Sequence, residues 1–70
     1  MSDRLTWDDS YAIARSLISL HLDADLERVS LQDIFQWTSE LPDFDDDPAL
    51  CNDAILLAIY REWFEEVNSI

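Results

Sequence analysis

Apolar residues recur at helical spacing along three stretches of the chain, and polar segments separate these stretches. The first stretch opens at Thr6, which can cap a helix, and Asp9 stands where a capping box prefers Glu. His21 falls in the last turn, where the helix dipole favours a partly cationic ring, so we interpret it as a helix-terminus residue rather than a metal ligand. The apolar face of this predicted helix carries Trp7, Ala14, Leu17, Ile18 and Leu20, with Ile13 at its edge.

A second helix is predicted after a polar connector over residues 23–27. A short alternation of apolar and polar positions around Ser30 allows a few extended residues at most. Ser30 and Asp33 then form the next helix-start signal, and Pro42 ends the helix because proline has no N–H to donate. The stripe of this helix consists of Leu31, Ile34, Phe35, Thr38 and Leu41, with Trp37 at the edge.

The third helix has two candidate starts. Asp47 can cap a helix that has Pro48 at its first position, and Asn52 offers an alternative cap one turn later. The apolar stripe of this helix consists of Leu56, Ile59, Tyr60, Trp63, Phe64 and Val67. Its opposite, polar face carries Arg61, Glu62, Glu65 and Glu66. Together the three patterns predict a mostly α, small three-helix single domain over residues 1–70, with little or no strand.

The composition is strongly acidic but too apolar for a disordered tail. The formal net charge is −12, from 16 acidic residues against 4 arginines, while the hydrophobic fraction is 49%. This charge repels the phosphates of nucleic acids and the surface of anionic membranes, so we expect neither as a partner. A basic protein surface or a hard cation is the expected complement.

Missing residue types exclude several kinds of chemistry. Without glycine the chain has no phosphate-cradling loop, dinucleotide fingerprint or glycine-bearing calcium loop, and any left-handed residue in a turn has to be Asp or Asn. Without lysine it has no Schiff base. His21 and Cys51 are single, so we expect no enzymatic activity and no tightly bound cofactor. The polar N-terminus and the lack of an apolar run near the ~20 residues of a membrane span predict a soluble cytoplasmic protein.

A dense acidic segment lies between the second and third predicted helices, where Asp43, Asp45, Asp46 and Asp47 surround Phe44. Carboxylates suit hard cations and hold Fe²⁺ weakly when no imidazole or thiolate helps. Adjacent aspartates point at one ion only if the backbone bends, so the alternative is a solvated loop whose last aspartate caps a helix. Since neither Asp45 nor Asp46 is the proposed cap, we expect their replacement to leave the helices unchanged. We interpret Phe44 as an anchor that packs the loop down.

A second acidic group, Glu62, Glu65 and Glu66, lies near the carboxyl end of the third predicted helix. The helix dipole disfavours anions there by a few tenths of a kcal/mol each, or about 1 kcal/mol at most. Arg61 offsets only part of this cost. A local cost without a visible gain indicates a functional surface, and a solvated face is the alternative.

The order of several short motifs resembles that of a known family. Trp7 precedes Asp9-Ser10, and Val29 precedes Asp33 and Gln36-Trp37. Leu41 is followed by Asp43-Phe44-Asp45-Asp46-Asp47-Pro48, and Asn52 by Ile55-Leu56, Ala58-Ile59 and Trp63. This ensemble, which extends from Leu5 to Glu66, is similar to the IscX family of small acidic proteins in bacterial iron–sulfur cluster assembly.

The resemblance implies a winged-helix-like fold, a monomer, and docking on the cysteine desulfurase that supplies sulfur for cluster assembly. It implies that surface acids also bind ferrous iron weakly and exchangeably, and that members compete with frataxin. We assign both partner and metal binding to the two acidic groups without the proposed cap Asp47, namely to Asp43, Asp45, Asp46, Glu62, Glu65 and Glu66. Ile34 and Phe35 stand where the family commonly has Met-His, so this chain lacks a histidine that could assist a metal site.

Three functions fit the charge. One is an accessory protein that docks on the desulfurase and modulates sulfur transfer. Another is a dedicated iron donor, or metallochaperone, that uses the same carboxylates, and the third is an acidic mimic of DNA. The resemblance favours the first two, and the lack of a Cys or His cluster favours docking with weak metal binding.

Overall fold

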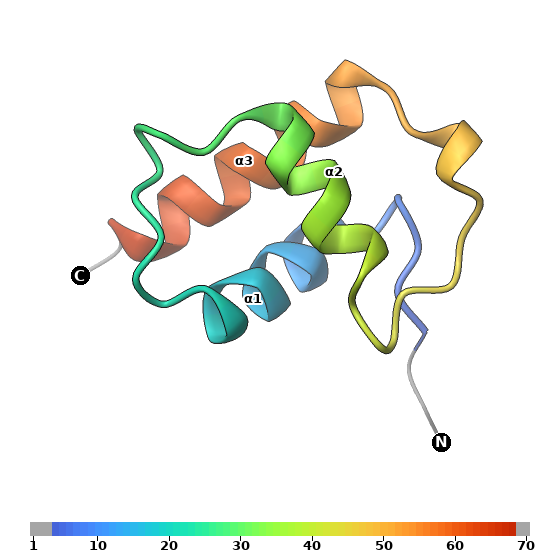
Figure 1. The fold of residues 1–70 in the computed structure, drawn as a ribbon, viewed down its shortest axis with the longest axis horizontal. Helices are drawn as coiled ribbons and strands as arrows, with labels where there is room; N and C mark the ends of the chain where they lie inside the picture. Colours follow the sequence, from blue (N-terminus) through green and yellow to red (C-terminus); the bar gives the residue numbers. More distant parts are fainter. Residues whose placement is uncertain (1–3, 69–70) are drawn as a thin grey trace.

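The computed structural model describes residues 4–68 and contains three α-helices within them: α1 (Ser10–Leu20), α2 (Leu31–Ser39) and α3 (Asp53–Val67) (Figure 1). A short 3₁₀ helix, η1 (Pro48–Leu50), precedes α3. The predicted three-helix fold is therefore confirmed. Within the described residues there is no strand, and the only β pairing is a single parallel bridge between Leu5 and Phe44. The winged-helix resemblance is not confirmed.

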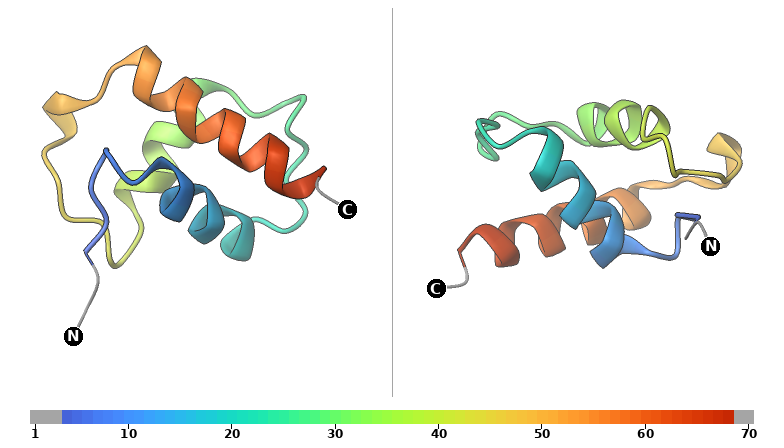
Figure 2. Two further views of the ribbon diagram at one scale, coloured as in Figure 1. Left: turned by 180° about the vertical axis from the view of Figure 1, so that it is seen from behind. Right: turned by 90° about the horizontal axis from the view of Figure 1, so that it is seen from below.

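The three helices enclose one hydrophobic core. The longest helix, α3, packs most extensively against α1 and less so against α2 (Figure 2). The N-terminal segment before α1 also contributes to the core, through Leu5 and Trp7. The other buried apolar residues are Ile13, Ala14, Leu17, Ile34, Leu41, Leu56, Ile59 and Trp63. A chain of this size thus closes its core with its helices and its N-terminal segment together.

The start of α1 differs from the prediction. Residues 6–9 form a turn, and the helix begins at Ser10. The Asp9 carboxylate accepts hydrogen bonds from the Thr6 backbone N–H (3.2 Å) and from the Thr6 hydroxyl (3.3 Å). Asp9 therefore accepts the backbone hydrogen bond expected of the acid in a capping box. The Thr6 hydroxyl, however, donates to Asp9 instead of capping the helix. The turn directs Trp7 into the core.

The start of α2 agrees with the prediction. The Asp33 backbone N–H donates to the Ser30 hydroxyl, and the Ser30 backbone N–H donates to the Asp33 carboxylate, both at 3.1 Å. This reciprocal pair is a complete capping box. Ile34 and Thr38 of the predicted stripe are buried.

Both candidate starts of the third helix are used, one after the other. The Asp47 carboxylate accepts a hydrogen bond from the Ala49 N–H (2.9 Å) and caps η1. The backbone then becomes extended at Cys51, and the Asn52 side chain accepts from the Ile55 N–H (2.9 Å) and caps α3. No described residue has a positive φ, so turns and caps reverse the chain there without any left-handed residue.

Some apolar residues lie on different surfaces from those predicted. Ile13, placed at the edge of the first face, is fully buried, whereas Leu20, placed on that face, is exposed because it lies beyond the core beside an open pocket. On α3, Phe64 and Val67 are half-exposed because they line an open hollow between this helix and the connector that follows α1. The α3 stripe is therefore wider than the core it serves.

The two caps predict different losses of stability. We expect Asn52→Ala to lower the free energy of unfolding by about 1 kcal/mol, because Asn52 caps the 15-residue α3. Asp47→Ala should lower it less, since η1 is exposed and has only 3 residues. Urea denaturation followed by circular dichroism measures both, and a larger loss for Asp47→Ala would contradict this assignment.

Candidate functional site

The acidic loop, residues 43–47, is held against the N-terminal segment by backbone hydrogen bonds. The Leu5 N–H donates to the Asp43 carbonyl (2.8 Å), and the Asp45 N–H donates to the Leu5 carbonyl (2.9 Å). Figure 1 shows this segment running beside the loop that follows α2. The backbone of the loop is therefore ordered by contacts with residues far away in the sequence.

Two of the loop aspartates hold Trp7. The Asp46 carboxylate accepts hydrogen bonds from the Trp7 backbone N–H (3.0 Å) and from the Asp47 N–H (2.8 Å). The Asp47 carbonyl accepts from the Trp7 indole N–H (2.9 Å). Both N–H groups of Trp7 are therefore satisfied by the acidic loop. Asp46 therefore contributes to the fold outside the helices, a role that the expectation of unchanged helices did not consider.

Phe44 anchors the loop as predicted. Its ring meets the edge of Trp7 with the centroids 4.6 Å apart, and Trp7 in turn stacks on Phe35 at 5.9 Å, with the planes 7° apart. Aromatic contacts of these kinds add about 0.5–1.5 kcal/mol each beyond the area they bury. Phe44 therefore faces inward and leaves the carboxylates on the outside of the loop.

Asp43 and Asp45 are the loop carboxylates that the backbone does not use. Asp45 forms an ion pair with Arg4 (2.9 Å), but both side chains are largely exposed, so the pair contributes about 1 kcal/mol at most. Within residues 4–68, the Asp43 carboxylate has neither a hydrogen bond nor an ion pair. These two carboxylates are available to a cation or a basic partner.

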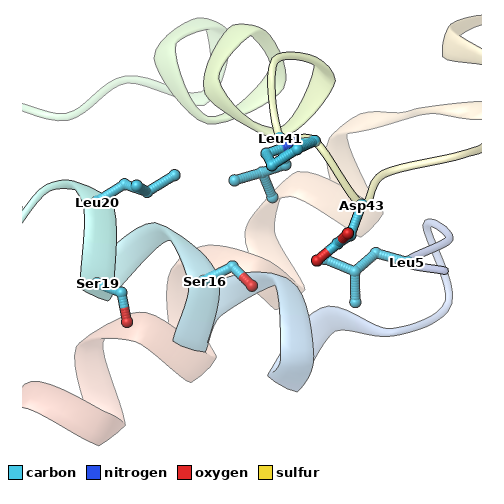
Figure 3. A pocket seen from close by; sticks show the side chains of 7 residues that line it. Leu5, Ser16, Ser19, Leu20, Leu41 and Asp43 are labelled. Atoms are coloured by element: carbon cyan, nitrogen blue, oxygen red, sulfur yellow. The ribbon is translucent and has the colours of Figure 1, made fainter. Parts of the chain in front are cut away.

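An open pocket of about 210 Å³ adjoins the loop (Figure 3). The side chains of Ser16 and Asp43 project into it from opposite sides, over the aliphatic groups of Leu5 and Leu41. Neither histidine nor cysteine lines the pocket, whose other lining residues are Ser19, Leu20 and Pro42. Its lining can receive a polar or cationic side chain, and within residues 4–68 neither serine hydroxyl is hydrogen-bonded to Asp43.

The surroundings of Cys51 and His21 favour structural roles for both side chains. Burial is the main cause that raises the pKa of the Cys51 thiol above its ordinary value, and the nearby charge of Asp53 adds to this. A raised pKa lowers the thiolate fraction and with it the reactivity of the thiol. The His21 N–H donates to the Leu17 carbonyl at the end of α1 (2.8 Å), and its ring stacks on Trp37 at 4.2 Å, which confirms a helix-terminus residue.

The unfavourable position of the α3 glutamates near the helix carboxyl end is partly offset by an arginine from another helix, which the sequence pattern did not predict. Arg15 of α1 donates a 2.7 Å hydrogen bond to Glu66, and this bond is the main cause that raises the pKa of Arg15. Sequence reasoning considered only Arg61, so the expected cost without compensation was wrong for Glu66. Glu62 and Glu65 have no ion pair within the described part of the chain.

The two acidic groups form two separate surfaces. The loop lies at one end of the long axis of the molecule, and the C-terminal part of α3, which carries Glu62, Glu65 and Glu66, lies at the other (Figures 1 and 2). Among residues 4–68, no three His, Cys, Asp or Glu side chains gather in a way that could hold a metal ion. The six predicted binding residues are therefore not brought together into one site.

The protein family described as iron-sulphur cluster assembly matches residues 5–68. The chain belongs to this family, the IscX family. An uncharacterized protein of Pseudomonas aeruginosa is 37% identical over 62 residues, which cover 89% of the chain and 94% of that protein. The resemblance to IscX proteins is thus confirmed, and the process in which the family acts is iron–sulfur cluster assembly.

In the described residues, 4–68, none of the helices combines the length and the hydropathy that a membrane span requires.

The grip on Trp7 predicts unequal effects of two neighbouring aspartates. We expect Asp46→Ala to lower the free energy of unfolding by about 1–3 kcal/mol, because it leaves a half-buried N–H without its charged acceptor. The matched control is Asp45→Ala, which removes only an exposed ion pair. Thermal and urea melts measure both changes, and equal losses would show that Asp46 does not hold Trp7.

The ion pair of Glu66 predicts a contrast within α3. Glu66→Gln should lower the melting temperature because it weakens the contact with Arg15, whereas Glu65→Gln should leave it unchanged or raise it by relieving repulsion with the helix dipole. A double-mutant cycle with Arg15→Gln isolates the coupling. The assignment fails if the two glutamine variants melt alike.

Proposed function

We propose that this IscX-family protein is a non-catalytic accessory protein that docks on the cysteine desulfurase and modulates sulfur transfer. The observation that carries the proposal is that several acidic side chains face solvent and are not needed to hold the fold together. Asp46 and Glu66 serve the fold, whereas Asp43, Asp45 and Glu65 face solvent. The net charge of −12 then favours a partner with a basic surface.

The position of the two acidic groups at opposite ends of the molecule suits docking on a partner better than tight binding of a metal ion. Surface charges steer a complementary partner over distances of the order of the Debye length, about 10 Å at 0.1 M salt, without having to converge on one point. A tight metal site requires several ligands around one ion. The separation of the loop from the glutamates of α3 therefore favours partner recognition.

Ferrous iron enters this proposal as a weak and exchangeable ligand. The carboxylates of Asp43, Asp45, Glu62 and Glu65 suit hard divalent cations, and no imidazole supports them in either acidic group. The alternative function is a dedicated iron donor. Competition with frataxin and a monomeric state stay predictions from the family resemblance, and a cytoplasmic location stays a prediction from the sequence pattern.

The test is a titration against the purified desulfurase at ~0.01 M and ~0.15 M salt, with and without Fe²⁺. Between these concentrations the Debye length falls from about 30 Å to about 8 Å, so we expect the affinity to drop at least several-fold. Docking should occur without iron. Binding that requires Fe²⁺ would support the iron donor, and an affinity unchanged by salt would contradict electrostatic docking.

A matched pair of variants locates the contact. Asp43→Asn with Asp45→Asn should weaken desulfurase binding at low salt, because it neutralises the available carboxylates of the loop. Asp8→Asn with Glu40→Gln makes the same change in net charge at exposed positions elsewhere. Equal weakening by the two double variants would mean that total charge, and not the loop, determines binding.

A further inference from the structure

Helix α3 carries two apolar rows, of which the core uses one. Leu56, Ile59 and Trp63 are buried. A second row follows at i, i+3, i+7 and i+10, and it consists of Leu57, Tyr60, Phe64 and Val67. In this row Leu57, Phe64 and Val67 are 54%, 51% and 50% exposed.

The exposed row continues onto the connector between α1 and α2. Leu22 is 78% exposed and lies with Phe64 and Val67 along a hollow of about 310 Å³. Phe64 also lines a second hollow with Leu57 and Tyr60, so the two hollows adjoin the same side chain. We call Leu22, Leu57, Tyr60, Phe64 and Val67 the outer apolar face.

The folded chain gains nothing from leaving this face open. Exposed apolar surface forgoes about 25 cal/mol for each Å² that could be buried, and contiguous exposed patches on small proteins mark interaction sites. Within residues 4–68 the Tyr60 hydroxyl donates to the Leu26 carbonyl (3.1 Å), whereas the side chains of Leu22, Leu57, Phe64 and Val67 stay exposed. The outer apolar face therefore fits a partner protein.

The charges around the face indicate what that partner is. Asp25 and Glu27 line the hollow beside Leu22, and Glu65 is an exposed neighbour of Phe64 on α3, whereas Arg61 is the cation of the adjoining hollow. A second copy of the chain would bring the same acids and its own net charge of −12 against this rim. A segment with an apolar stripe and basic flanks is complementary to both the face and its rim.

We propose that the outer apolar face docks an amphipathic helix with basic flanks, carried by the protein that the acidic surfaces recruit. From Leu57 to Val67 the row rises by ten residue steps, or about 15 Å, which matches an apolar stripe of about three turns. The rim steers the encounter, while burial of Leu57 and Phe64 supplies affinity that salt does not screen. This inference rests on the proposed function because its partner is the desulfurase.

The first test compares two double variants in desulfurase binding at ~0.5 M salt. Leu57→Gln with Phe64→Gln should lower the remaining affinity at least tenfold and leave the melting temperature unchanged or higher, since both side chains are half-exposed. The control is Leu20→Gln with Leu50→Gln, at two leucines that are 61% and 60% exposed elsewhere. If the α3 variant binds as the wild type does while Asp43→Asn with Asp45→Asn weakens binding at low salt, this inference fails and the proposed function stands.

The second test does not depend on the desulfurase. A synthetic helical peptide with leucines on one face and arginines on its flanks is titrated into labelled protein, beside a scrambled peptide of the same composition. We expect NMR shift changes centred on Leu57, Tyr60 and Phe64 with the helical peptide only. Equal shifts with both peptides, or shifts centred on the acidic loop, would overturn the inference. Sedimentation that reveals a dimer lost in Leu57→Gln with Phe64→Gln would assign the face to a second copy and also overturn it.

Discussion

The hold of the acidic loop on Trp7 is the interaction on which the rest of the structure depends. The Trp7 ring stacks on Phe35 and meets Phe44, while its backbone and indole N–H groups bind the Asp46 carboxylate and the Asp47 carbonyl. One side chain thus joins the segment before α1, helix α2 and the loop. The Trp7 ring buries a large apolar area, and the hydrogen bonds of its N–H groups orient the loop. Trp7 therefore fixes the loop to the core.

The same arrangement divides the acidic residues by task. Carboxylates that accept hydrogen bonds from the backbone, such as Asp46 and Asp47, stabilise turns and helix starts. Those outside such contacts, such as Asp43 and Glu65, keep their charge for a partner or a cation. The high net charge of this small domain therefore comes from two kinds of acidic residue, those that stabilise the fold and those that are free to bind a partner or a cation.

Local rules predicted most of the fold, and long-range contacts explain what they missed. Ser30 with Asp33, and Asn52, start helices as their side-chain chemistry predicts, because a cap acts within one turn. The Thr6 signal was misread because Trp7 is bound by residues about 40 positions away. The pairing of Arg15 with Glu66 and the separation of the two acidic groups also depend on how the helices pack, which no local pattern contains. Family membership was readable because its motifs are contiguous in the chain.

The parallel bridge between Leu5 and Phe44 has a consequence for the order in which the chain becomes ordered. The bonds on this side join residues separated by 39 to 41 positions, whereas the helices close over a few residues each. Closing so long a loop costs entropy that only a formed core repays. The acidic loop and the N-terminal segment should therefore order together as the core forms around Trp7, after the individual helices have closed. A partner that binds the loop would then slow hydrogen exchange at Leu5 and Trp7 as well, because the N–H groups of both residues donate to the loop.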